Sequence, residues 1–161
     1  LQTSPPTPSG EVSLGISVGA LLDIAHSARI VIAEFNANMP VTAGESRLPL
    51  SRIDYATESA TPLCAYHTPA AQARDERIVE HVLDLVPDGA WVQLGIGAVP
   101  DRILPRLADK RDIQLFSGLL TGGLATFVER CRHTPSITVG ELAGDQAFYD
   151  WCGRHAGVRM A

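Results

Sequence analysis

The chain has 161 residues, of which 45% are hydrophobic and 19% charged, and its formal net charge is −5 at pH 7. This composition is typical of a soluble globular protein with a real core, and it excludes disordered and repetitive chains. The negative charge argues against general nucleic-acid binding, which needs a basic surface. The longest apolar runs, such as 30–33 and 90–92, are far too short to span a bilayer, so we expect no membrane association.

The three cysteines, Cys64, Cys131 and Cys152, have no disulfide-framework spacing, which indicates a reducing compartment. We therefore expect a cytoplasmic protein, with no secretory signal at its start. The chain begins at Leu1, not Met, and stops at Ala161 without a cap. We interpret both ends as cut, so that the remaining segments of a longer chain are expected partners in folding.

The first part of the chain has the pattern of an α/β unit. Prolines make residues 3–10 a loop. Alternating residues predict a strand over 12–18, a short helix follows over 20–27, and β-branched residues predict a buried strand over 28–35. This order of strand, helix and strand is the unit of a parallel sheet.

The stretch 36–69 is polar and rich in proline, and it predicts a long loop without regular structure. We place a domain boundary near its end. The expected division is 1–68, the end of one α/β domain with an interdomain loop, and 69–161, the start of a second domain.

The second part predicts three consecutive pairs of strand and helix after a helix over 70–86. Apolar residues at helical spacing mark that first helix, and Pro87-Asp88-Gly89 ends it. The strands are expected over 90–94, 113–116 and 136–139, and the helices over 99–108, 120–130 and 145–151. The fold class is therefore α/β with open, mostly parallel sheets.

The segment 94–101, Leu-Gly-Ile-Gly-Ala-Val-Pro-Asp, joins a predicted strand to a predicted helix and is the most informative motif. Its glycines let the backbone approach a ligand, and Pro100 suits the first helical turn. The free N–H groups of the helix start could hold an anion or stabilise a tetrahedral oxyanion. The motif lacks the third glycine of a dinucleotide fingerprint and the lysine of a P-loop, so a tight packing turn fits it equally well.

Six segments, in the same order along the chain, resemble the acetyl-CoA hydrolase/transferase family. The resemblance is strongest to its 4-hydroxybutyrate CoA-transferases. The segments are 4–18, 32–40, 44–46, 51–54, 86–90 and 93–101. The resemblance covers an internal portion of a family member. It implies two open α/β domains with coenzyme A bound between them, acyl-CoA and a carboxylate acceptor as substrates, a possible homo-oligomer and no metal. It also implies cofactor-binding roles for Asn36, Asn38, Gln93, Gly95, Ile96 and Gly97.

Family enzymes use a glutamate that attacks the thioester and forms a mixed anhydride, after which the released CoA thiolate forms a glutamyl-CoA thioester. The resemblance aligns this glutamate with Gly118, in the segment 114–123, and the preceding serine with Ser117. No carboxylate lies between Asp112 and Glu129. Because glycine has no side chain, the covalent route cannot run through this position.

Four explanations of Gly118 stay open. The protein could be a non-catalytic acyl-CoA-binding or scaffolding subunit, or it could transform acyl-CoA by activating water with another group. A paralogous chain could supply the carboxylate, or the residue could have been altered. Glu34 and Glu141, near predicted strand ends, are candidates for a substitute acid or base, although solvated carboxylates are common there.

A zinc-stabilised interaction module is the weakest alternative. Cys131-Arg132-His133 and Cys152-Gly153-Arg154-His155 contain two thiolate and two imidazole ligands, which tetrahedral zinc accepts. The spacing is irregular, and cysteines near helix ends are more often packing residues. A serine hydrolase is disfavoured because Leu115 stands where a nucleophile elbow needs glycine before Ser117.

Overall fold

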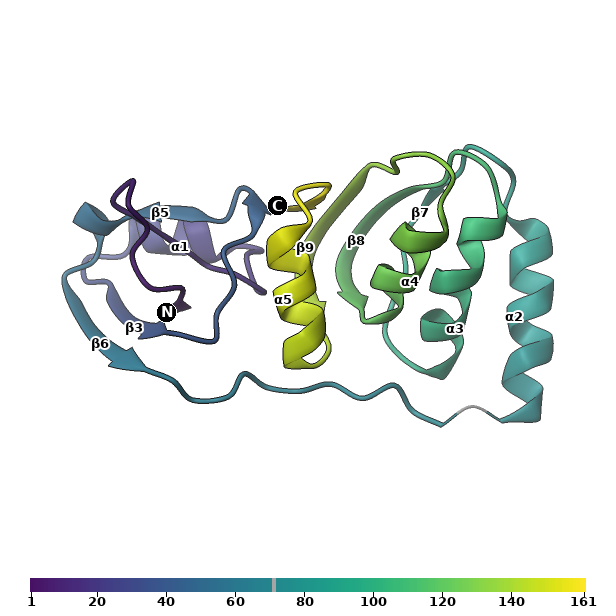
Figure 1. Cartoon of the computed structure of the whole chain (residues 1–161), viewed down its shortest axis with the longest axis horizontal. Helices are drawn as coiled ribbons and strands as arrows, with labels where there is room; N and C mark the ends of the chain where they lie inside the picture. The colour runs from purple at the N-terminus through teal and green to yellow at the C-terminus, as the bar shows by residue number, and fades with distance from the viewer. Residues whose placement is uncertain (71) are drawn as a thin grey trace.

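The computed structural model describes residues 1–70 and 72–161. The first part holds a small parallel sheet in the order β1-β3-β6, together with an antiparallel pair, β2-β5, and one short helix, α1 (Figure 1). The bounds are β1 Gln2–Thr3, β2 Glu11–Ser13, α1 Leu21–Ser27, β3 Ile32–Asn36, β5 Arg47–Pro49, a 3-10 turn Leu50–Arg52 and β6 Tyr55–Ser59. Val12, Ala25, Val31 and Leu48 form its core.

The strand expected over 12–18 ends at Ser13, because the chain turns at Gly15. Gly15 has a φ of 65°, and a Cβ there would lie 2.2 Å from Sδ of Met39. The strands expected over 12–18 and 28–35 also do not pair with each other as a parallel unit. The partner of β2 is β5, in antiparallel register, and the parallel neighbours of β3 are β1 and β6.

The expectation that 36–69 lacks regular structure is wrong. The stretch holds β5, β6 and a two-residue strand, β4 (Ala43–Gly44). Short strands of this kind are stabilised by partners far away in sequence, and local patterns do not reveal them.

The second part is a five-stranded parallel sheet in the order β4-β10-β9-β8-β7. The expected three pairs of strand and helix are confirmed, with a fourth strand, β10, after the last helix. The bounds are α2 Ala73–Leu85, β7 Trp91–Val92, α3 Ala98–Arg106, a 3-10 turn Leu107–Asp109, β8 Gln114–Thr121, α4 Gly123–Arg130, β9 Ile137–Ala143, α5 Gln146–Arg154 and β10 Val158–Met160.

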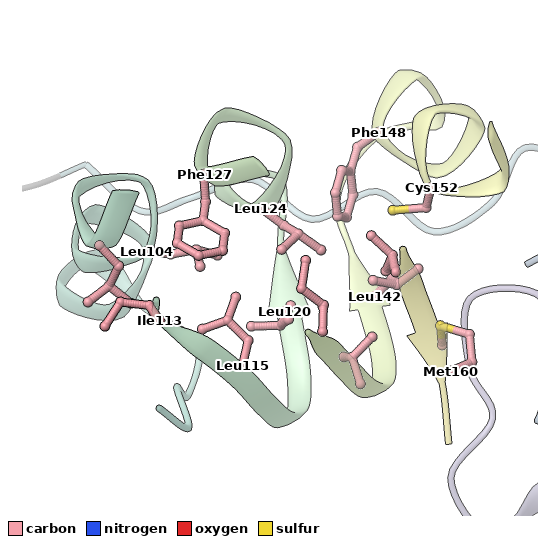
Figure 2. Packing of buried hydrophobic residues seen from close by; sticks show 14 of the residues in the cluster. Leu104, Ile113, Leu115, Leu120, Leu124, Phe127, Leu142, Phe148, Cys152 and Met160 are labelled. Carbon is pink, nitrogen blue, oxygen red and sulfur yellow. The ribbon is translucent and has the colours of Figure 1, made fainter. Parts of the chain in front are cut away.

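Helices α3, α4 and α5 lie on one face of this sheet (Figure 1). The strands β7 to β10 are neighbours in both sequence and space. Because the crossover between two such parallel strands is right-handed, each connecting helix lies on the same side of the sheet. Figure 2 shows the resulting core, in which side chains of the strands meet those of the helices. Its members include Leu104, Leu115, Leu120, Leu124, Phe127, Leu142 and Phe148, all buried.

The two parts share the larger sheet. Strand β4 pairs with β10 in parallel register, Ala43 with Arg159 and Gly44 with Met160. Ser17 forms an isolated antiparallel bridge with Glu141 of β9. The proposed division at residue 68 falls between β6 and α2, in the segment 60–70 that runs past α5 in Figure 1.

Across the described residues, every helix is too short or too polar to cross a lipid bilayer.

Candidate functional site

Strand β8 presents alternate side chains to the two faces of the larger sheet. Leu115 and Ser117 are buried on the helix side, whereas Phe116 and Gly118 are exposed on the opposite face. A Cβ added at Gly118 would meet no atom within 4 Å. The position proposed for the family glutamate is therefore open to solvent and has room for a side chain.

Gly118 lies in a shallow cavity of about 310 Å³. The cavity brings Gly118 together with two other residues singled out in the sequence, Gln93 and Glu141, and with Thr138 and Gly140. Gly140 is the neighbour of Gly118 across the strand pair, because Ser117 pairs with Val139 and Leu119 with Glu141. Local sequence patterns gave no sign of Thr138 or Gly140, because only the register of β8 and β9 places them here.

Glu141 supplies a side-chain carboxylate to this cavity. Its side chain is exposed, and Oε1 lies 3.4 Å from the Ser17 hydroxyl. Glu34, the other carboxylate considered from the sequence, lies on β3 and accepts a hydrogen bond from Gln2 at 3.1 Å. Only Glu141 of these two candidates lines the cavity beside Gly118.

Ser117 connects the strand to the glycine loop. Its hydroxyl donates to the carbonyl oxygen of Leu94 at 2.7 Å and lies 2.9 Å from that of Leu119. Ser117 is 3% exposed, so these bonds satisfy a buried polar group. The serine therefore positions the start of the loop 95–97 next to β8.

The loop 95–97 ends at the start of α3, as expected. Gly97 is the residue before the helix and has a φ of 131°, a conformation that favours glycine. Pro100 lies in the first helical turn. A Cβ at Gly95 would meet nothing within 4 Å, and the Ile96 side chain is 55% exposed. The loop thus presents accessible backbone near a helix start.

A buried carboxylate that the sequence did not single out lies behind this loop. Asp101 of α3 is 7% exposed and accepts hydrogen bonds from Thr121 Oγ1 at 2.9 Å and Tyr66 Oη at 3.1 Å. Burial, together with the hydrogen bond and the charge of Asp101, raises the pKa of Tyr66 above its ordinary value. Asp101 is the last residue of the segment 94–101 that resembles the family, and this position was the one sign in the sequence that could have pointed to it.

Asn36 and Asn38 hold the segment after β6. Asn36 is fully buried, donates from Nδ2 to the Thr61 carbonyl at 2.8 Å, and accepts at Oδ1 from the Asn38 N–H at 2.9 Å. Asn38 donates to the Ala60 carbonyl at 2.9 Å. Neither asparagine lines the Gly118 cavity in the described part of the chain. Their proposed contact with a cofactor stays a prediction.

The cysteine and histidine pairs lie in different surroundings. Cys152 is 1% exposed and packs in the core, and this burial raises the pKa of its thiol to about 12. The ring of His155 stacks on Trp151 with centroids 3.9 Å apart. Within residues 1–70 and 72–161, no three His, Cys, Asp or Glu side chains are grouped so that they could hold a metal ion.

Known proteins are similar to this chain in sequence. Residues 1–65 match the acetyl-CoA hydrolase/transferase N-terminal domain. The chain is 35% identical to the 4-hydroxybutyrate coenzyme A transferase of Clostridium kluyveri, over 94% of this chain and 37% of that protein. The first 65 residues therefore resemble the N-terminal domain of that family, and nearly the whole chain is similar to a CoA transferase.

A second CoA transferase is similar over the same region. The succinyl-CoA:cyclohexane-1-carboxylate CoA transferase of Geobacter metallireducens is 24% identical, over 98% of this chain and 38% of that protein. The chain thus spans less than two-fifths of the length of these relatives.

Solved structures share the fold. RipA from Yersinia pestis superposes with a TM-score of 0.91 at 28% identity, covering 99% of this chain and 39% of RipA. The 4-hydroxybutyrate CoA-transferase of Porphyromonas gingivalis superposes with a TM-score of 0.89, covering 99% of this chain and 43% of that chain at 24% identity. The α/β fold with open, mostly parallel sheets is therefore of the CoA-transferase type.

Proposed function

We propose that this protein handles acyl-CoA as an enzyme of the CoA-transferase or acyl-CoA hydrolase type, with the usual nucleophile position occupied by Gly118. The observation that carries the proposal is the cavity that places Gln93, Gly118 and Glu141 together in a chain similar to CoA-transferases over almost its whole length. The substrates would be an acyl-CoA and either a carboxylate acceptor or water. The two relatives described above are CoA transferases by name.

In this proposal the loop 95–97 and Gln93 contact the thioester. The exposed backbone at Gly95 and the helix start after Gly97 supply N–H groups that could stabilise a tetrahedral oxyanion. Ser117 keeps this loop against β8, so that the thioester carbonyl would lie over the open face at Gly118.

Glu141 supplies the acid and base in place of the family glutamate. Its carboxylate takes a proton from water, and the water oxygen attacks the thioester carbon. As the tetrahedral intermediate collapses, the carbon–sulfur bond breaks and the CoA thiolate takes a proton from Glu141. The products are the free carboxylic acid and coenzyme A. This route requires no covalent enzyme intermediate.

One observation favours a second candidate function. Gly118 offers no nucleophile, and the side chain of Glu141 is exposed to solvent. A non-catalytic subunit that binds acyl-CoA, or that scaffolds a catalytic partner, also fits this site. A cytoplasmic location suits either function and is part of the proposal.

Hydrolysis of acetyl-CoA, butyryl-CoA and succinyl-CoA by the complete gene product tests the proposal. We expect turnover that falls at least 100-fold in Glu141→Gln, in line with loss of general acid–base catalysis. The matched control is Glu80→Gln on the exposed part of α2, which should leave turnover unchanged. Binding of all three thioesters without turnover would favour the non-catalytic subunit, and no binding would contradict both functions.

A further inference from the structure

A second cavity lies at the end of the larger sheet where β7, β8 and β9 begin. Its volume is about 580 Å³, and it is formed by the loops that precede β7, β8 and β9, by the 3-10 turn after α3 and by the end of α4. The stretch of β8 from Gln114 to Gly118 spans roughly 13 Å at the rise of a strand, and the two cavities share no lining residue. The two cavities are therefore separate sites.

Positive charge is concentrated in this second cavity. It is lined by Lys110, Arg111, Arg130, Arg132 and His133, against two carboxylates, Asp88 and Asp109. The whole chain, in contrast, carries a net charge of −5. A local excess of cations on an acidic protein favours a negatively charged ligand.

Both carboxylates are already paired with an arginine. Asp88 Oδ2 lies 2.8 Å from Arg111 Nε, and Asp109 Oδ1 lies 2.6 Å from Arg130 Nη2. Lys110 and Arg132 form no ion pair with any residue that the structure describes. The cavity therefore keeps two cationic side chains available to a ligand.

The loop that carries Lys110 and Arg111 is fixed in place. The Arg111 N–H donates to Asp88 Oδ1 at 2.8 Å, and the Gly89 N–H donates to the Arg111 carbonyl at 2.8 Å. The chain then turns at Asp112, which has a φ of 55°, rare for a residue other than glycine. These bonds hold the basic residues in a defined arrangement before any ligand arrives, which lowers the entropic cost of binding.

His133 adds an unsatisfied polar atom. Its Nε2 is buried and has no hydrogen-bond partner within the described residues. Buried polar atoms are nearly always paired, so an atom of this kind indicates a missing partner such as an anion or a water molecule.

We propose that this second cavity binds an anion with two or more phosphate groups. Planar guanidinium groups match phosphate oxygens in bidentate geometry, and Lys110 adds a point charge. The cavity is larger than a single phosphate needs, and its two unpaired cations suit a ligand with more than one phosphate. The ligand class is therefore inorganic pyrophosphate or an organic diphosphate.

Isothermal titration of the complete gene product with inorganic pyrophosphate tests this inference. We expect saturable binding to one site that weakens as ionic strength rises. The double variant Lys110→Gln/Arg132→Gln should bind at least tenfold more weakly. The matched control, Arg77→Gln, removes one cation from the exposed part of α2 outside the cavity and should bind as the unchanged protein does.

Circular dichroism establishes that each variant is folded. The variant His133→Asn provides a second, independent change in the same cavity.

Competition with coenzyme A then separates two sources of a diphosphate. Displacement of pyrophosphate would assign the cavity to a nucleotide diphosphate, and retention would assign it to free pyrophosphate. Absence of saturable binding to the unchanged protein, or equal affinity in the double variant, would overturn the inference.

Discussion

The Tyr66 hydroxyl, on the segment between the two sheets, lies 3.1 Å from Oδ2 of Asp101 on α3. The other oxygen of the same carboxylate accepts a hydrogen bond from Thr121 at the end of β8. The segment between β6 and α2, the helix after the glycine loop and the strand that carries Gly118 thus meet at one buried carboxylate.

Removal of either hydroxyl should destabilise the fold. Hydrogen bonds to charged groups contribute about 1.5–3 kcal/mol, and we expect Thr121→Val, which removes a donor that is 2% exposed, to cost about 2 kcal/mol. Tyr66→Phe should cost less, about 1 kcal/mol, because Tyr66 is only half-buried and water can replace its hydroxyl. Urea unfolding measures both. Tyr55→Phe, on a side chain that is 65% exposed, is the control; equal losses in all three variants would contradict the prediction.

The sequence predicted the second part of the chain better than the first. Long, strongly periodic segments such as α2 and the strand and helix pairs after it depend on local pattern and on a continuous apolar face. The strands β4 and β5 are two and three residues long and depend on distant partners. No local rule could therefore distinguish them from loop.

In the candidate site, too, the sequence predicted some residues and missed others. Gly95, Gly97 and Gly118 were found because motif and resemblance act on contiguous residues. Their assembly with Glu141 depends on the register of β8 against β9, and the Tyr66–Asp101 contact joins residues 35 positions apart. Asn36 and Asn38 were chosen by resemblance, and in the structure their amides hold the segment after β6.

The contact between the two parts should be sensitive to a single methyl group at Gly44. Gly44 has a φ of 90°, and a Cβ there would lie 2.3 Å from the Met160 carbonyl oxygen in β10. We expect Gly44→Ala to lower the melting temperature and to make the segment between the sheets sensitive to protease. Gly89→Ala is the matched control, because Gly89 also has a positive φ, 76°, but open space around it. A loss no larger than in this control would contradict a close β4–β10 contact.

The cysteines should react with a thiol reagent in a fixed order. Cys64 is exposed, Cys131 is partly buried with a raised pKa, and burial raises the pKa of Cys152 to about 12. At pH 8 we expect Cys64 to react first, Cys131 slowly, and Cys152 only after unfolding. Fast modification of all three thiols in the folded protein would contradict this order.

Cys152 also predicts an alkaline loss of stability. Its folded pKa of about 12 is above the ordinary value of 9.0, so folding favours the neutral thiol. This contribution is fully present below pH 9 and is lost as the pH rises toward 12. Unfolding free energies across this range should decline less steeply in Cys152→Ala than in the unchanged protein. Identical slopes would contradict the assignment.

Two phenylalanines should separate stability from function. Phe127 is fully buried among the core residues of Figure 2, so Phe127→Ala should cost about 3–5 kcal/mol in urea unfolding. Phe116 is 59% exposed and lines the Gly118 cavity, so Phe116→Ala should change stability by less than about 0.5 kcal/mol. It should weaken acyl-CoA binding, and unchanged binding would contradict the position of the site on this face.

Exchange of labelled acetate into acetyl-CoA tests the central claim most directly, because it requires the carboxylate nucleophile that Gly118 lacks. The complete gene product should hydrolyse acyl-CoA without exchange. Gly118→Glu should fold normally, because a side chain there meets open space, and should gain exchange. Gly140→Ala, whose Cβ would lie 3.0 Å from the Gly118 carbonyl oxygen, is a neighbouring control that should gain none. Exchange by the unchanged protein, at a rate that Gly118→Glu does not increase, would contradict the account.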